Sequence, residues 1–268
     1  MTERFDSKLE FAKFLAVEAG KLAQKLYQEQ DETFISVKGL QDFVTVADRQ
    51  VEEKIRALIS QCYSSDAVLG EEEGLSGSGE AIWVIDPIDG TANFMRGLPD
   101  WAVSIGYCER DEIELGAIYA PDRDELCWAA KGQGAFCNDR QVHVSDCSRA
   151  EQALLLLGRS TRNPVQDYLA TIERTVNAQM EYRRNGSAAV SLMNVAQGRA
   201  EGYYEAHLNA WDAVAGVLII REAGGLVHSA PVPELLKHGS RILAVTPKLE
   251  QVVIGSVVPC DRKVSSRP

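Results

Sequence analysis

Two carboxylates, Asp86 and Asp89, stand three residues apart at the end of an apolar run. Pro87 between them fixes one backbone angle, and Gly90 lets the chain turn sharply or approach a ligand closely. Thr91 can then begin a short helix, whose free amide N–H groups form a site for an anion. Because magnesium prefers carboxylate and carbonyl oxygens, one turn could hold both a metal ion and a phosphate.

Three further carboxylates stand where other expected elements begin or end. Glu71 follows the apolar residues 67–69, Asp212 opens an apolar helix, and Asp48 lies in the first turn of another. Each has an ordinary explanation: a solvated run of charge for Glu71, and an aspartate stabilised by the helix dipole for the other two. Residues 86–90 could likewise be a surface turn. Carboxylates at the ends of four different expected elements in one chain favour a carboxylate cluster instead.

Hydrophobic periodicity and capping signals predict alternating helices and strands. Helices are expected over residues 7–29, 45–59, 164–179, 187–196 and 211–223, with a last helix near the C-terminus. Strands are expected over residues 67–69, 81–85, 103–107, 113–120, 126–129, 153–157, 202–205 and 242–245. The three strands between residues 103 and 129 are expected to form an antiparallel meander. Long helices with mixed strands predict a layered α/β or α+β core. We expect one unit over residues 1–268, with a possible division into 1–148 and 149–268.

The composition excludes several kinds of partner. Apolar residues make up 45% and charged residues 25% of the 268 residues, which is typical of a globular chain that can bury a core. The net charge of -11 argues against nucleic acid, because binding to a phosphate backbone needs a basic face. An acidic protein that binds a small phosphate needs local positive charge, and a metal ion is one source of it.

The cysteines and the N-terminus indicate the compartment. No C-x-x-C pair and no zinc-like cysteine and histidine spacing is present, so we expect reduced, mostly buried thiols in a reducing compartment. The six cysteines are Cys62, Cys108, Cys127, Cys137, Cys147 and Cys260. Residues 1–14 are too charged for a signal peptide, and no apolar run approaches the roughly 20 residues that span a bilayer. We therefore expect a cytoplasmic protein with no membrane partner.

Four segments together resemble the inositol monophosphatase family: residues 42–48, 70–72, 83–94 and 211–225. They stand in the family's order and spacing and extend the resemblance over nearly the whole chain. Within them, Asp-Pro-Ile-Asp-Gly-Thr, Trp-Asp and Glu-Ala-Gly-Gly are the most specific matches. The resemblance implies an α+β fold, a layered αβαβα sandwich of mixed sheets and helix pairs. It also implies a homodimer and a magnesium-dependent phosphatase, often inhibited by lithium, that acts on a small phosphorylated metabolite.

The resemblance implies that two or three magnesium ions bind at matching positions. Glu71, Asp86 and the backbone carbonyl of Ile88 would hold one ion. Asp86, Asp89 and Asp212 would hold a second, and Glu71 would also touch a third, water-rich ion.

The same resemblance implies the catalytic and substrate-binding residues. Glu71 is expected to be catalytic, and Thr91, supported by Asp48, would orient the attacking water. The amides of Gly90 and Thr91 would receive the phosphate. The residues expected to contact substrate are Asp89, Gly90, Thr91, Gly186, Ser187, Ala188, Glu205 and Asp212.

Some residues depart from the family pattern. Lys38 lies four residues before Asp42, one fewer than for the family's lysine near the metals. Arg159 stands where inositol-specific members carry a small polar residue, and Val214 replaces a smaller one. The adjacent arginines at 183 and 184 are either a solvated pair or a contact at the site or at a subunit interface.

The residues after Thr91 and the absence of a nucleophile motif lead to predictions of substrate and mechanism. Ala92 and Asn93 after Thr91 favour the inositol-phosphate branch. Inositol monophosphate is therefore the first expected substrate, ahead of histidinol phosphate, a sugar bisphosphate and a nucleotide 3′-phosphate. Since no nucleophile motif is present, we predict direct in-line attack by a metal-activated water without a phosphoryl-enzyme intermediate.

Three alternatives are less well supported. A haloacid-dehalogenase-type phosphatase needs Asp-x-Asp-x-Thr/Val, but after Asp122 and Asp124 the chain has Glu125 and Leu126, so we interpret this segment as a turn. A P-loop is missing from the sequence. A non-catalytic regulatory protein on a phosphatase scaffold is the alternative from another class, and the presence of every expected metal ligand argues against it.

Overall fold

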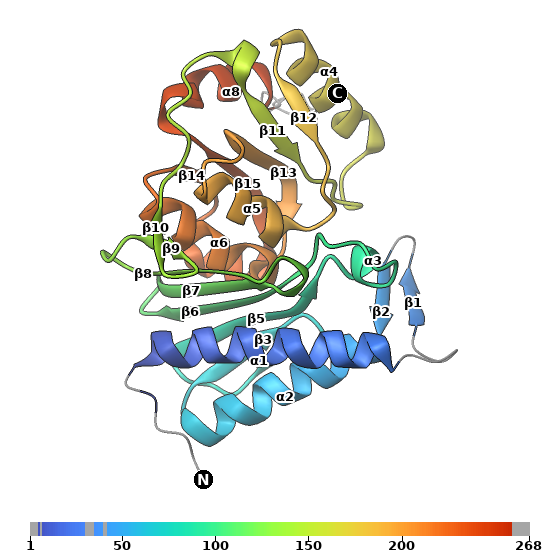
Figure 1. Cartoon of the computed structure of the whole chain (residues 1–268), viewed down its shortest axis with the longest axis vertical. Coiled ribbons are helices and arrows are strands. Elements are labelled where there is room, and N and C mark those ends of the chain that lie inside the picture. Colours follow the sequence, from blue (N-terminus) through green and yellow to red (C-terminus); the bar gives the residue numbers. More distant parts are fainter. Residues whose placement is uncertain (1–4, 6, 30–34, 40–41, 259–268) are drawn as a thin grey trace, which may run out of the picture.

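Layers of helices and sheets alternate along the long axis of the molecule in a computed structural model (Figure 1). The structure describes residues 5, 7–29, 35–39 and 42–258, with the backbone alone for 35–39 and 42–45. From one end to the other the layers are a helix pair, an eight-stranded sheet, a second helix pair, a five-stranded sheet and outer helices. The expected αβαβα sandwich of mixed sheets is therefore confirmed.

The first helix pair covers the outer face of the large sheet. Helix α1 (Lys8–Gln28) begins where the Ser7 hydroxyl accepts a hydrogen bond from the Glu10 amide at 3.2 Å, as the capping pattern predicts. Helix α2 (Val46–Cys62) follows the hairpin formed by strands β1 (Ile35–Gly39) and β2 (Asp42–Thr45). The apolar faces of both helices are buried, with Phe11 and Ile55 fully inaccessible. Burial of these faces fixes the two helices on the sheet.

The large sheet has the strand order β10-β9-β8-β7-β6-β5-β3-β4. Among the described strands of this sheet, only β3 and β5 pair in parallel, and the expected meander of β6, β7 and β8 is confirmed. Its strands are β3 (Ala67–Gly70), β4 (Gly74–Ser76), β5 (Ala81–Asp89), β6 (Ala102–Glu109), β7 (Glu112–Ala120), β8 (Glu125–Ala130), β9 (Ala135–Cys137) and β10 (Arg140–Val142).

The second helix pair lies between the two sheets and is apolar on all sides. Helices α5 (Ala188–Ala196) and α6 (Ala210–Glu222) are buried over almost their whole length. A Cβ atom built on Gly106 would lie 2.6 Å from the Val214 side chain, and one on Gly116 would lie 2.6 Å from the Ala215 carbonyl. These two glycines of β6 and β7 therefore let α6 approach the sheet closely. Val214, a departure from the family pattern, fills the space above Gly106.

The five-stranded sheet has the order β12-β11-β13-β15-β14. Strand β11 (Leu154–Leu157) runs parallel to both β12 (Glu181–Arg183) and β13 (Gly202–Leu208). Strand β15 (Ser240–Val245) is antiparallel to β13 and to β14 (Leu226–His228). The outer face of this five-stranded sheet packs on α4 and α8 around a separate apolar core. The other α-helices of the described residues are α3 (Thr91–Phe94), α4 (Val165–Asn177), α7 (Val232–His238) and α8 (Glu250–Ser256).

The structure also differs from the sequence-based expectations. Strands β1, β2, β4, β9, β10, β12 and β14 and helix α7 were not predicted, because segments of three to seven residues carry too little periodicity. Residues 86–89 are not a turn but the irregular end of β5, which continues to Asp89. None of the five cysteines in the described residues forms a disulfide; three are buried, Cys147 is half-buried and Cys62 is exposed. Cys260 lies outside the described residues. No described helix is long and apolar enough to cross a membrane.

Candidate active site

The end of β5 presents two carboxylates through a local irregularity in its pairing with β6. Asp86 pairs with Ser104 and Asp89 with Ala102, so the register shifts between them. Such a bulge redirects side chains that a regular strand would place on fixed faces. The Ile88 amide donates to Asp86 Oδ1 at 3.0 Å and holds that side chain in place.

Asp212 reaches the same place from the first turn of α6. Its Oδ2 accepts hydrogen bonds from the backbone amide of Asn209 at 3.0 Å and from the Asn209 side chain at 3.3 Å, which completes a capping box. The Ser104 hydroxyl donates to the Trp211 carbonyl at 3.1 Å. Since Ser104 is also the strand partner of Asp86, this bond connects the start of α6 to the end of β5.

Asp86, Asp89 and Asp212 form the cluster that results. One carboxylate oxygen from each lies within 4.8 Å of the other two. Asp86 is fully buried, and its Oδ2 has no hydrogen-bond partner in the described part of the chain. A buried carboxylate oxygen that no donor reaches is costly unless a cation accompanies it or the carboxyl is protonated, in which case Asp86 and Asp212 can share a hydrogen bond. The donor set, which is oxygen alone, fits a hard divalent cation such as magnesium.

Electrostatics in the cluster favour the same interpretation. Burial raises the pKa of Asp86 well above its usual value, and the charges of Glu71, Asp89 and Asp212 raise it further. Burial, followed by the charge of Asp89, raises the pKa of Asp212 to about 7. Burial also raises the pKa of Asp89, although hydrogen bonds from Ser187 and Ala189 oppose that rise. These carboxylates therefore cannot all ionise at low cost without added positive charge.

Thr91 stands beside the cluster at the start of α3. Its hydroxyl lies 3.2 Å from Asp48 Oδ1 and 3.1 Å from the Ile88 carbonyl oxygen. One hydroxyl has one proton, so it can donate to either acceptor while its lone pairs stay available to a water. Asp48 is fully buried. Gly90, with a φ of 96°, turns the chain so that residues 90–92 line the cavity next to the cluster.

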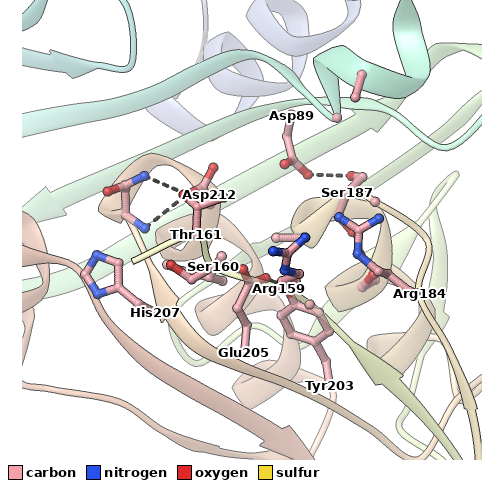
Figure 2. Close-up of a pocket in the computed structure, with 18 of the residues that line it drawn as sticks. Asp89, Arg159, Ser160, Thr161, Arg184, Ser187, Tyr203, Glu205, His207 and Asp212 are labelled. Atoms are coloured by element: carbon pink, nitrogen blue, oxygen red, sulfur yellow. Dashed lines mark hydrogen bonds between the residues drawn. The ribbon is translucent and has the colours of Figure 1, made fainter. Parts of the chain in front are cut away.

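The cluster opens into a cavity of about 470 Å³ (Figure 2). The expected substrate-contacting residues 186–188 and Glu205 line it together with Glu71, Asp89 and Asp212. Ser187 donates a hydrogen bond to Asp89 and caps α5 by accepting one from the Val190 amide at 3.1 Å. The structure thus brings these residues to one site. The side chain of Lys38 lies outside what the structure describes.

Comparison with known proteins agrees with this geometry. The family model described as "Inositol monophosphatase family" matches residues 6–260. This chain belongs to the inositol monophosphatase family.

Individual members of the family show how far the likeness extends. The Nus factor SuhB of Pasteurella multocida is 36% identical over 251 residues, which cover 91% of this chain and 93% of that protein. A fructose-1,6-bisphosphatase/inositol-1-monophosphatase of Aquifex aeolicus is 37% identical over 227 residues, covering 84% and 86%. The crystal structure of the extragenic suppressor protein suhB from Bartonella henselae superposes with a TM-score of 0.87 at 33% identity, covering 94% and 98%. Membership supports phosphatase activity for this chain.

A buried ion pair that the sequence did not indicate holds in place the turn after β3, which carries Glu71. Glu52 is fully buried, pairs with Arg56 at 2.8 Å, and accepts the amides of Glu72 at 2.8 Å and Glu73 at 3.0 Å. A Cβ atom on Gly70 would lie 2.4 Å from Glu52 Oε1, so a larger residue there would displace the Glu52 carboxylate from these contacts. The spacing of Glu52 and Arg56 was the available signal, but it is common on helix surfaces.

The part of the cavity near Glu205, which is expected to face the alcohol part of the substrate, also contains residues that sequence reasoning missed. The Tyr203 hydroxyl donates to Glu205 Oε2 at 2.5 Å, and a Cβ atom on Gly158 would overlap that oxygen at 1.8 Å. Burial raises the pKa of Glu205 to about 8, and the charges of Asp212 and Asp89 add to the rise. Asn93 Nδ2 donates to the carbonyls of Asp100 and Asn185, which ties α3 to the loop before α5.

Proposed function

We propose that this protein hydrolyses a small phosphate monoester in a magnesium-dependent reaction, with inositol monophosphate as the first substrate. The observation that carries the proposal is the unpaired, fully buried Oδ2 of Asp86 within a cluster of three carboxylates that adjoins the cavity. Family membership supports the reaction class. Histidinol phosphate, a sugar bisphosphate and a nucleotide 3′-phosphate follow as alternatives.

Magnesium held in this cluster supplies positive charge that offsets the phosphate and the developing charge of the leaving oxygen. Glu71, Asp86 and the Ile88 carbonyl would hold one ion, and Asp86, Asp89 and Asp212 a second. Glu71 would also reach a third ion.

The other residues position the reactants. Thr91 accepts a hydrogen bond from the attacking water while its own proton points to Asp48 or to the Ile88 carbonyl. The amides of Gly90 and Thr91 orient the phosphate. We expect attack by water itself, because the sequence carries no nucleophile motif and the Thr91 hydroxyl, beside Asp48, is assigned to orienting that water. Trapping a phosphorylated side chain during turnover would refute that expectation.

Phosphate release from a panel of these monoesters, with and without magnesium, tests the proposal. Asp89→Asn should weaken magnesium binding by calorimetry and nearly abolish turnover. Asp139→Asn is a matched control, because the Asp139 side chain is 83% exposed and lies outside the cavity lining. Near-normal turnover of Asp89→Asn at limiting magnesium would show that the metal assignment is wrong.

A regulatory role is the second candidate, because several relatives carry the name Nus factor SuhB. A purely regulatory protein has no need of the carboxylate cluster, and here Glu71, Asp86, Asp89 and Asp212 are all present. Absence of magnesium-dependent phosphate release across the whole panel would favour the regulatory role.

Several expectations from the sequence and from the resemblance stay predictions. They are a homodimer, sensitivity to lithium, a cytoplasmic location, and the absence of nucleic-acid and membrane partners. Light scattering and lithium titration of the phosphatase activity measure the first two directly.

A further inference from the structure

One side of the cavity is cationic although the protein is acidic. Arg159, Arg162 and Arg184 line it, while Glu71, Asp89 and Asp212 line the metal side. Figure 2 shows Arg159 and Arg184 among the residues that surround the same space as Asp89 and Glu205. Against a net charge of -11 for the whole chain, three arginines at one cavity form a local reversal of charge.

The topology of the small sheet brings two of these arginines together. Strands β11 and β12 are parallel neighbours, with Leu156 opposite Arg183. Arg159 lies two residues beyond the end of β11, and Arg184 directly follows β12. Because the carboxyl ends of parallel strands meet at one edge of a sheet, both arginines project from that edge, which is where α/β proteins commonly bind ligands.

The arginines differ in their partners. Arg162 is anchored, with Nη1 2.6 Å from His207 Nε2 and Nη2 donating to Asn209 Oδ1 at 3.0 Å. Within the described residues, neither Arg159 nor Arg184 has a hydrogen bond or an ion pair within 4 Å. Arg183 contrasts with them, because its Nη1 donates to Glu181 at 2.8 Å and to the Tyr182 carbonyl at 2.7 Å. The two adjacent arginines therefore differ in role. Arg183 has hydrogen-bond partners and does not line the cavity, whereas Arg184 lines it.

The nearby carboxylate of Glu205 interacts with the charge of Arg184 but does not bond to it directly. It is buried and accepts a hydrogen bond from Tyr203, and no ion pair joins it to an arginine in the described structure. Burial raises the pKa of Glu205, and the hydrogen bond from Tyr203 and the charge of Arg184 oppose that rise. Two guanidinium groups at one cavity, neither in a direct ion pair within the described residues, favour binding of an anion.

We infer that Arg159 and Arg184 bind a second anionic group, a phosphate or a carboxylate, on the alcohol part of the substrate. A guanidinium group matches both anions with paired N–H donors. The inference rests on the proposed phosphatase function and narrows its substrates. It favours esters with two anionic groups over esters whose alcohol part is neutral, such as inositol monophosphate. If it holds, a sugar bisphosphate moves to first place among the proposed substrates.

Matched substrates and variants test the inference. Fructose 1,6-bisphosphate is compared with fructose 1-phosphate, and 3-phosphoglycerate with glycerol 3-phosphate, so the two pairs separate a second phosphate from a carboxylate. We expect at least one doubly anionic ester to have the higher kcat/KM. Arg159→Gln and Arg184→Gln should each reduce that advantage about tenfold through KM, since this binding is equal in the ground and transition states. Arg183→Gln, the control, should keep the advantage.

The possible outcomes separate the two proposals. No advantage for either doubly anionic ester, or equal losses on both members of each pair, would overturn the arginine inference and leave the phosphatase proposal intact. If no monoester is hydrolysed, the phosphatase proposal fails, and binding of fructose 1,6-bisphosphate is measured by calorimetry with magnesium present. Binding that is lost in the double variant Arg159→Gln/Arg184→Gln supports the inference. Binding that is unchanged overturns it.

Discussion

Asp212 should destabilise the metal-free protein at neutral pH. Burial and the charge of Asp89 raise its pKa from 3.8 to about 7. The folded state therefore holds this proton more tightly than the unfolded state does. The stability that this proton contributes is fully present below about pH 4 and is lost as the pH rises towards 7. The interval between the two pKa values corresponds to a loss of up to about 4 kcal/mol.

Asp212→Asn tests this directly. Without metal at about pH 8, we expect the variant to be more stable than the wild type by roughly 2–4 kcal/mol, because the amide is neutral. The asparagine oxygen can still accept the Asn209 amide, which lies 3.0 Å from the native carboxylate. Added magnesium should stabilise the wild type and leave the variant almost unchanged, because binding to the folded state alone raises stability.

Urea unfolding in a chelator and in magnesium, at about pH 5 and about pH 8, measures each of these differences. Asp139→Asn, the exposed control, should change the unfolding free energy by less than about 0.5 kcal/mol in every condition. If Asp212→Asn is less stable than the wild type without metal at the higher pH, the carboxylates do not repel one another as described, and the reasoning fails.

Three further changes probe the residues that position the site. Thr91→Ala should lower kcat about 100-fold with little change in KM, because it removes the hydroxyl between Asp48 and the water. Thr91→Ser keeps a hydroxyl and should restore activity. A change in KM alone would count against this role of Thr91. Glu52→Gln should lower the unfolding free energy by roughly 3 kcal/mol and weaken magnesium affinity, measured by urea unfolding and calorimetry; unchanged affinity would separate Glu52 from the Glu71 turn. Gly158→Ala should lower kcat/KM while metal binding is retained, because the new methyl group displaces Glu205. An unchanged kcat/KM would show that the backbone at residue 158 moves to accommodate the methyl group.

The sequence by itself determined the local chemistry of the site. Asp86, Asp89 and Gly90 lie within five residues, and neighbouring residues in a chain share one turn whatever the rest of the fold does. The start of α1 at Ser7 and the meander of β6 to β8 were predictable for the same reason, since capping and alternation are short-range signals. Family resemblance then supplied the roles of residues that no local pattern could connect.

Only the tertiary structure decided how distant segments meet. Asp212 joins Asp86 because Gly106 and Gly116 let α6 approach the sheet, and because Ser104 bonds to the carbonyl before Asp212. Arg159 and Arg184 meet because β11 and β12 are parallel neighbours. Contacts of this kind depend on strand order, register and helix approach, which arise from packing over the whole chain rather than from any window of its sequence.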